Sequence, residues 1–179
     1  MAVRSTLTRI GHALFTLGLS LALAVLFFHF VFQPFQVSGL SMSPTLKDQD
    51  YLLVDRLLTG KAHLRRGEIM VLRMPQGGPF IVKRLVGLPG DSVEIRDGVI
   101  RVNGKVFPPP PGGRVGTKDF GPFRVPQGHL FFLGDNGPVS LDSRQLGAIP
   151  VKDLYGRVVL RYLPLSRWGF IPGVPHESR

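Results

Sequence analysis

Apolar residues are concentrated in one continuous stretch near the amino terminus. Residues 13–32 read ALFTLGLSLALAVLFFHFVF and contain no Asp, Glu, Lys or Arg. About 20 helical residues, each rising about 1.5 Å, are enough to cross a hydrocarbon core about 30 Å thick. The pattern therefore predicts one transmembrane anchor at 13–32, with a short segment, 1–12, before it and the rest of the chain, 33–179, after it.

The positive charges beside this stretch predict its orientation. Arg4 and Arg9 precede it, whereas the first Lys or Arg after it is Lys47. Because positively charged flanks stay on the cytoplasmic side, we expect residues 1–12 in the cytoplasm and residues 33–179 outside it. The protein would then be a single-pass protein of the cell membrane.

A cleavable signal peptide is the alternative interpretation of the same stretch. Ala22-Leu23-Ala24 has the small-x-small form of a cleavage site. Cleavage there would leave a chain beginning VLFFHFVF, with no polar segment between the apolar run and the cleavage site. An uncleaved anchor fits the pattern better.

Beyond residue 33 the apolar positions follow the pattern of β-strands. Val, Ile, Leu, Phe and Tyr are enriched in seven short stretches, and no comparable stretch has helical periodicity. These stretches are 51–55, 68–74, 80–88, 92–96, 99–102, 129–134 and 156–163. The chain is therefore predicted to be mainly β: one transmembrane helix followed by an antiparallel β-sheet domain with few short helices.

Two kinds of connection punctuate these strands. Asp97-Gly98 and Asn103-Gly104 are typical of two-residue hairpin turns, whose central residues need positive φ. Residues 108–113 read PPPPGG and predict an exposed loop, because proline donates no backbone hydrogen bond to a sheet. A proline-rich ligand for a partner domain is the alternative for this segment.

Charge and composition narrow the classes of function. The net charge is +10, and subtracting Arg4 and Arg9 leaves +8 for the part beyond the apolar stretch. Such a surface suits anionic lipid or phosphate, whereas nucleic acid is not expected because the basic residues are scattered between strands. The absence of cysteine excludes disulfides and thiolate chemistry. No Cys/His metal cluster stands out, so neither a metal nor another cofactor is expected.

Residues 38–46, SGLSMSPTL, hold three serines directly after the predicted anchor. Serine is a common turn residue, and as a nucleophile it needs a base. His63 lies in a basic loop, His129 begins a strand and His176 lies in the tail, so none is a convincing base. The motifs GxSxG and SxxK are also missing, which leaves a lysine as the candidate base.

Lys83 interrupts the apolar stretch FIVKRLVGL. If its side chain points inward, desolvation lowers its pKa from about 10.4, and the neutral amine can accept a proton. Alternation along the strand leaves the opposite arrangement equally open, with Lys83 on the solvent face and Arg84 inward.

Three stretches in this order identify a family resemblance. SGLSMSPTL, VKRLVGLPGD (82–91) and GDNGPVSLDSR (134–144) resemble the conserved boxes of bacterial type I signal (leader) peptidases, which are membrane-bound serine proteases with a Ser-Lys dyad. RGEIMVLRMP (66–75) and YGRVVLRYLP (155–164) are also similar to family segments. The resemblance covers nearly everything after residue 33.

The resemblance implies a role for each matching residue. Ser41 would be the nucleophile, Lys83 the general base, and Ser140 the residue that hydrogen-bonds and orients the lysine amine. The supporting residues would be two ion pairs, Asp142 with Arg144 and Asp135 with Arg84.

The resemblance also implies which of the two arrangements of Lys83 and Arg84 is formed. If Arg84 pairs with Asp135, its side chain points away from the dyad, and Lys83 is the residue that faces Ser41. The alternative is that these four charged residues form exposed ion pairs in a loop, which would contribute little to the stability of the fold.

Three positions depart from the family pattern. Gly39 stands where some relatives carry a serine hydroxyl that completes the oxyanion hole. The backbone N–H of Ser41 would be one donor, and the second donor stays open. Gly137 and Val139 replace residues that are often Arg and Asn, at positions peripheral to the dyad.

Substrate contacts are also implied by the resemblance. Phe35, Val37 and Val82 would line shallow pockets for small residues such as Ala, although packing in the β-core is an equal alternative. An extended preprotein segment could bind by adding to a sheet edge. Trp168 and Phe170 could dip into the lipid interface, but we expect them to pack beneath the sheet.

The predicted function is removal of signal peptides from exported preproteins after Ala-x-Ala sites, through an acyl-enzyme and without a cofactor. The expected partners are preprotein signal peptides and membrane lipid, and the expected state is a monomer. A self-cleaving repressor with the same dyad fits less well, because the chain has an anchor and no DNA-binding helix pair. A peptide-binding β module without catalysis is disfavoured by the retention of Ser41, Lys83, Ser140 and Asp142.

Overall fold

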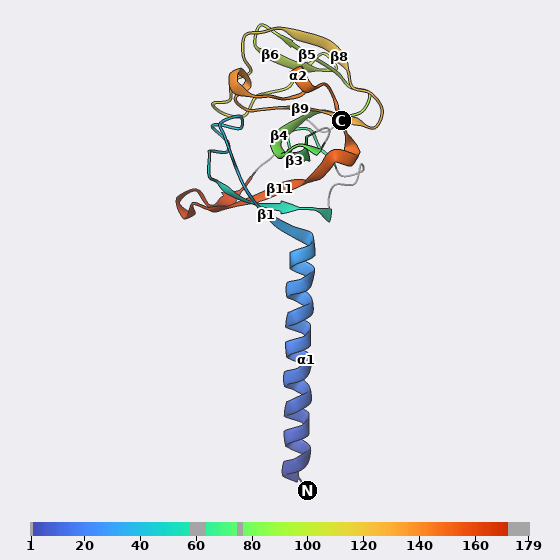
Figure 1. Cartoon of the computed structure of the whole chain (residues 1–179), viewed down its shortest axis with the longest axis vertical. Coiled ribbons are helices and arrows are strands. Elements are labelled where there is room, and N and C mark those ends of the chain that lie inside the picture. The colour runs from blue at the N-terminus through green and yellow to red at the C-terminus, as the bar shows by residue number, and fades with distance from the viewer. Residues whose placement is uncertain (1, 58–63, 75–76, 172–179) are drawn as a thin grey trace.

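The computed structural model describes residues 2–57, 64–74 and 77–171, with side chains from residue 11 onward. Its longest element is the helix α1 (Ala2–Val31), which projects as a rod from a β-rich domain (Figure 1). Residues 11–30 are exposed along the whole helix. The segment Gly11–Val31 is long and apolar enough to cross a membrane, which agrees with the predicted anchor at 13–32.

The larger sheet begins where α1 ends. Its eight described strands pair antiparallel in the order β1-β2-β11-β3-β4-β9-β10, and β12 pairs with β11. The strands are β1 (Phe32–Gln36), β2 (Tyr51–Asp55), β3 (Ile69–Arg73), β4 (Phe80–Gly87), β9 (His129–Leu133), β10 (Ile149–Pro150), β11 (Leu154–Leu163) and β12 (Gly169–Phe170).

A smaller antiparallel sheet covers the end of the domain distant from α1 (Figure 1). Its order is β7-β6-β5-β8, formed by β5 (Ser92–Arg96), β6 (Val99–Val102), β7 (Lys105–Val106) and β8 (Phe120–Arg124). Both predicted hairpin turns are confirmed, because the two central residues of each have positive φ: Asp97 51°, Gly98 72°, Asn103 54° and Gly104 79°.

The other helical elements within the described residues are short. They are α2 (Ser143–Leu146) and the 3₁₀ turns η4 (Gly137–Val139), η5 (Val151–Asp153) and η6 (Leu165–Arg167). The predicted class, a mainly β chain with one long amino-terminal helix and few short helices, is therefore confirmed.

Strands β4 and β9 lie at the centre of the core. On β9, Phe131 and Leu133 pack in the cluster below the smaller sheet, whereas Leu130 and Phe132 pack in a second cluster with β3. Successive side chains of a strand point to opposite faces, so both faces of β9 are covered. On β4, every residue from Lys83 to Gly87 is buried.

The seven predicted strands are present, with ends that differ by at most two residues. The strands that the pattern missed are β1, β7, β8, β10 and β12. Proline interrupts β1 at Pro34 and β8 at Pro122, and the other three have two residues each. Proline normally argues against a strand, and such short elements leave no detectable alternation.

Two expectations need correction. The segment 108–113 has no helix or strand, as predicted, but it is not exposed throughout because Pro110 is buried. Trp168 and Phe170 do not pack beneath the sheet, since they are 58% and 75% exposed.

Candidate active site

Ser41 lies in the connection between β1 and β2, residues 37–50, which we call the serine loop. Its neighbour Met42 is 1% exposed and Leu46 is fully buried, so two apolar side chains anchor the loop in the core. The backbone N–H of Leu46 donates to the carbonyl of Met42 at 2.9 Å. The half-buried Ser41 is therefore held at the edge of this anchored turn.

Lys83 and Ser41 meet although 42 residues separate them along the chain. The distance between Lys83 Nζ and Ser41 Oγ is 2.7 Å. Burial lowers the pKa of Lys83 below its usual 10.5, since desolvation disfavours the ammonium form, while the carboxylates of Asp142 and Asp135 oppose this shift. Both the position of the lysine amine and the direction of its pKa shift are therefore suitable for accepting a proton from this hydroxyl.

Of the two alternatives for position 83, the inward one describes β4, but Arg84 is buried as well. Lys83 is 4% exposed and Arg84 is 2% exposed, so neither side chain reaches solvent. Strand β4 pairs with β3 from Phe80 to Arg84 and with β9 from Arg84 to Gly87, and its residues 83–87 are all buried. Alternation of apolar and polar residues identifies the inward face only when the other face of the strand is exposed to solvent, and here both faces are buried.

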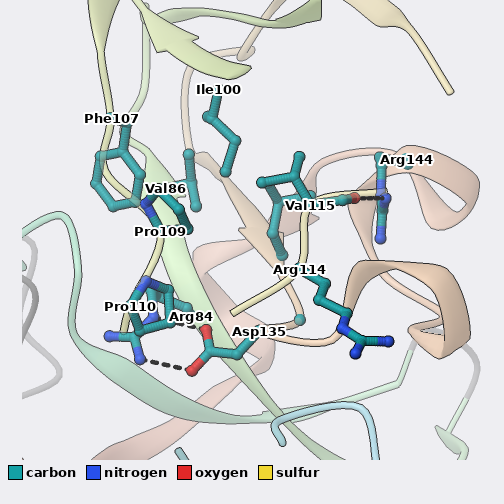
Figure 2. A pocket seen from close by; sticks show the side chains of 12 residues that line it. Arg84, Val86, Ile100, Phe107, Pro109, Pro110, Arg114, Val115, Asp135 and Arg144 are labelled. Atoms are coloured by element: carbon teal, nitrogen blue, oxygen red, sulfur yellow. Dashed lines mark hydrogen bonds and ion pairs between the residues drawn. The ribbon is translucent and has the colours of Figure 1, made fainter. Parts of the chain in front are cut away.

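Arg84 forms a two-pronged ion pair with Asp135. Its Nε donates to Oδ1 and its Nη2 to Oδ2, each at 2.7 Å (Figure 2). The third guanidinium nitrogen, Nη1, donates to the carbonyl of Gly67 at 2.5 Å. Both charges are buried and fully hydrogen-bonded, which is the condition under which a buried ion pair is tolerated.

Asp142 is fully buried and organises the segment 134–144. Its carboxylate accepts from Arg144 Nε at 2.9 Å and Nη2 at 2.8 Å, and from the backbone N–H of Gly134 at 2.9 Å. It also caps the amino terminus of α2. Arg144 in turn donates to the carbonyls of Val115 and Gly137, the former shown in Figure 2.

Ser140 lies close to the dyad but does not bond to it. Its side chain is buried, yet its Oγ has no hydrogen-bond partner among the described residues. The bond from Ser140 to the lysine amine is therefore not formed in this structure, and its orienting role stays a prediction. A Cβ on Gly134 would lie 2.2 Å from Ser140 Oγ and 2.6 Å from the Ser41 carbonyl oxygen, so only glycine fits between them.

The backbone around Gly39 bears on the predicted oxyanion hole. Gly39 has φ +93°, and its N–H donates to Asp48 Oδ1 at 2.7 Å. That donor is therefore engaged, whereas the N–H of Ser41 has no hydrogen-bond partner in the part of the chain that the structure describes. Asp48 was not singled out from the sequence, because its role depends on the turn of the loop.

Asn136 is a second residue that the sequence analysis missed. Its backbone N–H donates to the Ser41 carbonyl at 3.0 Å, and its side-chain Nδ2 donates to the Leu40 carbonyl at 3.1 Å. Asn136 thus fixes the backbone on both sides of the Leu40–Ser41 peptide. Its place inside the motif GDNGPVSLDSR was the available signal.

The three residues expected to line substrate pockets lie together. Val37 is buried in the core cluster that contains Met42, and Phe35 and Val82 are partly buried against it. The Phe35 ring also makes edge contacts with Phe80 at 5.4 Å and Tyr155 at 5.2 Å between centroids. All three residues thus take part in core packing, and a substrate-binding role stays a prediction.

The histidines give no alternative base in the described residues. His129 Nδ1 lies 3.0 Å from the carbonyl of Gln127, and the ring is bonded to neither Ser41 nor Lys83. His63 and His176 lie outside the described residues. Within the described ranges no group of three or more His, Asp or Glu side chains could hold a metal ion.

Comparisons with known proteins agree on one family. Residues 10–163 match the model of signal peptidase, peptidase S26. Signal peptidase I of Bacillus licheniformis is 36% identical over 159 residues, which cover 83% of this chain and 86% of that protein. Signal peptidase I T of Bacillus subtilis strain 168 is 35% identical over 159 residues, with 83% and 82% covered.

Matches are also found among solved structures. The crystal structure of a signal peptidase I from Enterococcus faecalis V583 is similar to 52% of this chain and 95% of that chain, with 31% identity and a TM-score of 0.46. The range 10–163 matched by the family model includes the serine loop, β4 and the segment 134–144.

Proposed function

The chain belongs to the signal peptidase family, peptidase S26, and we propose that it is a membrane-bound serine endopeptidase that removes signal peptides from exported preproteins. The observation that carries this proposal is the 2.7 Å contact between Lys83 Nζ and Ser41 Oγ in a desolvated site. A buried amine beside a hydroxyl is the minimum that a Ser-Lys dyad needs.

The proposed reaction has two steps. Neutral Lys83 takes the proton of Ser41 as its Oγ attacks the scissile carbonyl, and the N–H of Ser41 donates to the oxyanion. The lysine ammonium then protonates the departing amine, which leaves an acyl-enzyme on Ser41. Lys83 next accepts a proton from the attacking water and passes it to Ser41 Oγ as the ester bond breaks, which releases the signal peptide and restores the neutral serine and lysine.

Two buried carboxylates would keep Lys83 protonated if they were unpaired. Asp135 is neutralised by Arg84, and Asp142 by Arg144. Since each ion pair has a net charge near zero, its field at the amine is weaker than that of a lone carboxylate, and desolvation prevails. We propose that these pairs support the base in this way and that Ser140 orients its amine.

The proposed substrate site uses two open strand edges. β1 pairs only with β2 among the described strands, and the first half of β4 pairs with β3 but not with β9. Both edges adjoin the dyad, and an extended preprotein segment can bind by strand addition. Phe35, Val37 and Val82 would there contact small side chains, which selects Ala-x-Ala sites.

Anchor and activity fit one location. α1 would span the membrane with residues 1–12 in the cytoplasm and the catalytic domain on the outer side. The cleavage site at the carboxyl end of a signal peptide is reached from that side. The enzyme and its substrate would then meet within one bilayer.

Cleavage of a purified preprotein with an Ala-x-Ala site tests the proposal directly. Wild type, Ser41→Ala and Lys83→Ala are compared in lipid vesicles, and mass spectrometry locates the cut. We expect cleavage after the second alanine by wild type and loss of that cut in both variants. Failure of folded wild type on several preproteins would instead favour a peptide-binding module, and an active Ser41→Ala would exclude the dyad.

A further inference from the structure

Strand β11 is connected to both halves of the dyad. It lies between β2 and β3 in the larger sheet (Figure 1). Arg157 of β11 pairs with Met70 of β3, and Met70 pairs in turn with Lys83 of β4. Two steps of backbone pairing therefore fix the position of the lysine relative to β11.

Arg161, on the same strand, contacts the serine loop directly. Its Nη1 donates to the carbonyl of Thr45 at 3.0 Å, and its Nε donates to the carbonyl of Arg167 at 2.5 Å. Thr45 follows Ser41 by four residues in the serine loop. A side chain of β11 thus binds the backbone of the loop that carries the candidate nucleophile.

Asp50, the last residue of the serine loop, strengthens this connection. Its fully buried carboxylate pairs with Arg167 through Nη2 and, at 3.1 Å, through Nη1, and it lies 3.5 Å from Nη1 of Arg161. Its Oδ2 also accepts from the backbone N–H of Lys47 at 2.9 Å. Because a buried carboxylate that loses its partners is costly, this cluster resists rearrangement.

The serine loop is closed at its base and held on two sides. The N–H of Val37 donates to the carbonyl of Asp50 at 2.8 Å, which joins the first and last residues of the loop. On one side, the backbone N–H of Asn136 donates to the Ser41 carbonyl. Arg161 binds the loop from β11, so the loop has two independent attachments to the rest of the domain.

We infer that Arg161 is a positioning residue of the dyad, which together with Asp50 and Arg167 fixes the serine loop on β11 at the distance where Ser41 meets Lys83. In the described part of the chain the polar contacts of Arg161 go to Thr45, Asp50 and Arg167. It therefore acts through the loop and not on the reacting groups. Its effect on cleavage rests on the proposed function, whereas its hold on the loop does not.

Preprotein cleavage in lipid vesicles measures the effect on the reaction. Arg161→Gln should lower kcat about tenfold and change KM less than about twofold, because a displaced nucleophile slows the chemical step without weakening substrate binding. Arg124→Gln is the matched control, since Arg124 is exposed on β8 of the smaller sheet, and it should leave kcat unchanged. An unchanged kcat in Arg161→Gln would overturn the inference, as would equal losses in the two variants.

Val102→Ala controls for a loss of stability alone. Val102 is buried in the core cluster of the smaller sheet, so its truncation lowers the free energy of unfolding at a distance from the serine loop. Rates are compared at a temperature at which circular dichroism shows every variant folded, and we expect kcat of Val102→Ala to equal that of wild type. A fall in kcat as large as that of Arg161→Gln would show that Arg161 only stabilises the fold.

Arg161→Lys separates the charge of this residue from its geometry. An ammonium group keeps the attraction to Asp50, but it lacks the planar fork that reaches the carbonyls of Thr45 and Arg167 together. We therefore expect kcat of Arg161→Lys to stay below that of wild type. Full recovery of kcat would show that charge alone is sufficient, and would overturn the positioning role.

Amide hydrogen exchange, followed by NMR of the full chain in lipid nanodiscs, measures the hold on the loop without any activity. The N–H of Lys47 donates to the Asp50 carboxylate, and that of Leu46 bonds within the loop. Arg161→Gln should speed exchange at both about tenfold and leave the N–H of Leu85 on β4 unchanged, because only the loop is released. Equal changes at all three amides, or none, would overturn the inference. If the loop amides responded as expected but wild type cleaved no preprotein, the proposed function would fail while the hold on the loop stood.

Discussion

Two neighbouring cations of β4 are buried to nearly the same extent but have opposite surroundings. Arg84 is 2% exposed and shares two hydrogen bonds with Asp135. Lys83 is 4% exposed, and within the described residues its amine hydrogen-bonds to one group, the hydroxyl of Ser41. The pKa of Lys83 is lowered, chiefly by desolvation. The comparison teaches that a buried charge with a full set of partners supports structure, while one without a direct counter-ion is available for proton transfer.

The largest effect is expected when the residue at position 83 can no longer lose its proton. Lys83→Arg keeps a cation of similar length, but a guanidinium stays protonated. We expect kcat to fall by about 10³-fold, within the range for a lost general base. Cleavage rates beside the wild-type rate check this, and a variant within tenfold of wild type would show that Lys83 acts only as a charge.

The second test breaks the paired cation. Arg84→Met leaves the buried Asp135 without its partner, so we expect unfolding to become easier by about 3–5 kcal/mol. The unpaired carboxylate should also raise the pKa of Lys83 and move the acid limb of kcat/KM to higher pH. Urea denaturation and a pH profile measure the two effects, and Arg96→Met, in an exposed pair, is the control.

Asn136 sharpens the comparison on the nucleophile side. Asn136→Ala removes the Nδ2 bond to the Leu40 carbonyl, and a loss of about 1 kcal/mol in the positioning of Ser41 corresponds to roughly fivefold in kcat with little change in KM. Asn103→Gly is the control, because it removes an amide at a hairpin turn of the smaller sheet and tolerates the φ of 54°. Equal effects on kcat would show that Asn136 only stabilises the fold.

The smallest expected effect concerns stability and its dependence on pH. The folded-state pKa of Lys83 lies below 10.5, so folding is penalised at lower pH, and the penalty is lost as pH rises from the folded-state pKa to 10.5, where the unfolded chain binds more protons at this site. Lys83→Met should therefore be more stable than wild type at neutral pH, and the difference should shrink as pH rises towards 10.5. Urea midpoints across this range check the trend, and a constant difference would contradict the shift.

The strands could be predicted from the sequence because their apolar residues alternate or cluster between turn signals. β2, β5 and β6 have the predicted bounds, and the two hairpin turns have the expected positive φ. β1 and β8 could not be predicted in this way, because each contains a proline that only an edge or a tertiary contact accommodates. The exposure of Trp168 and Phe170 could not be predicted either, because it depends on which other elements pack against this segment.

The candidate site shows where sequence reasoning stops. The motifs single out Ser41 and Lys83, but the contact between them depends on the pairing of β4 with β3 and on the anchoring of the serine loop. Period-two alternation could not place Lys83 and Arg84, because β4 has no exposed face over these residues. Asn136 acts mainly through backbone carbonyls, which no sequence pattern displays.

Titration of Lys83 itself tests the central claim most directly. The full chain with ¹³Cε-labelled lysine is studied by NMR in lipid nanodiscs, and the signal is assigned by its absence in Lys83→Arg. We predict a pKa below 10.5 that coincides with the acid limb of kcat/KM for preprotein cleavage. A pKa at or above 10.5, or an acid limb that follows another group, would contradict the role of Lys83 as the base for Ser41.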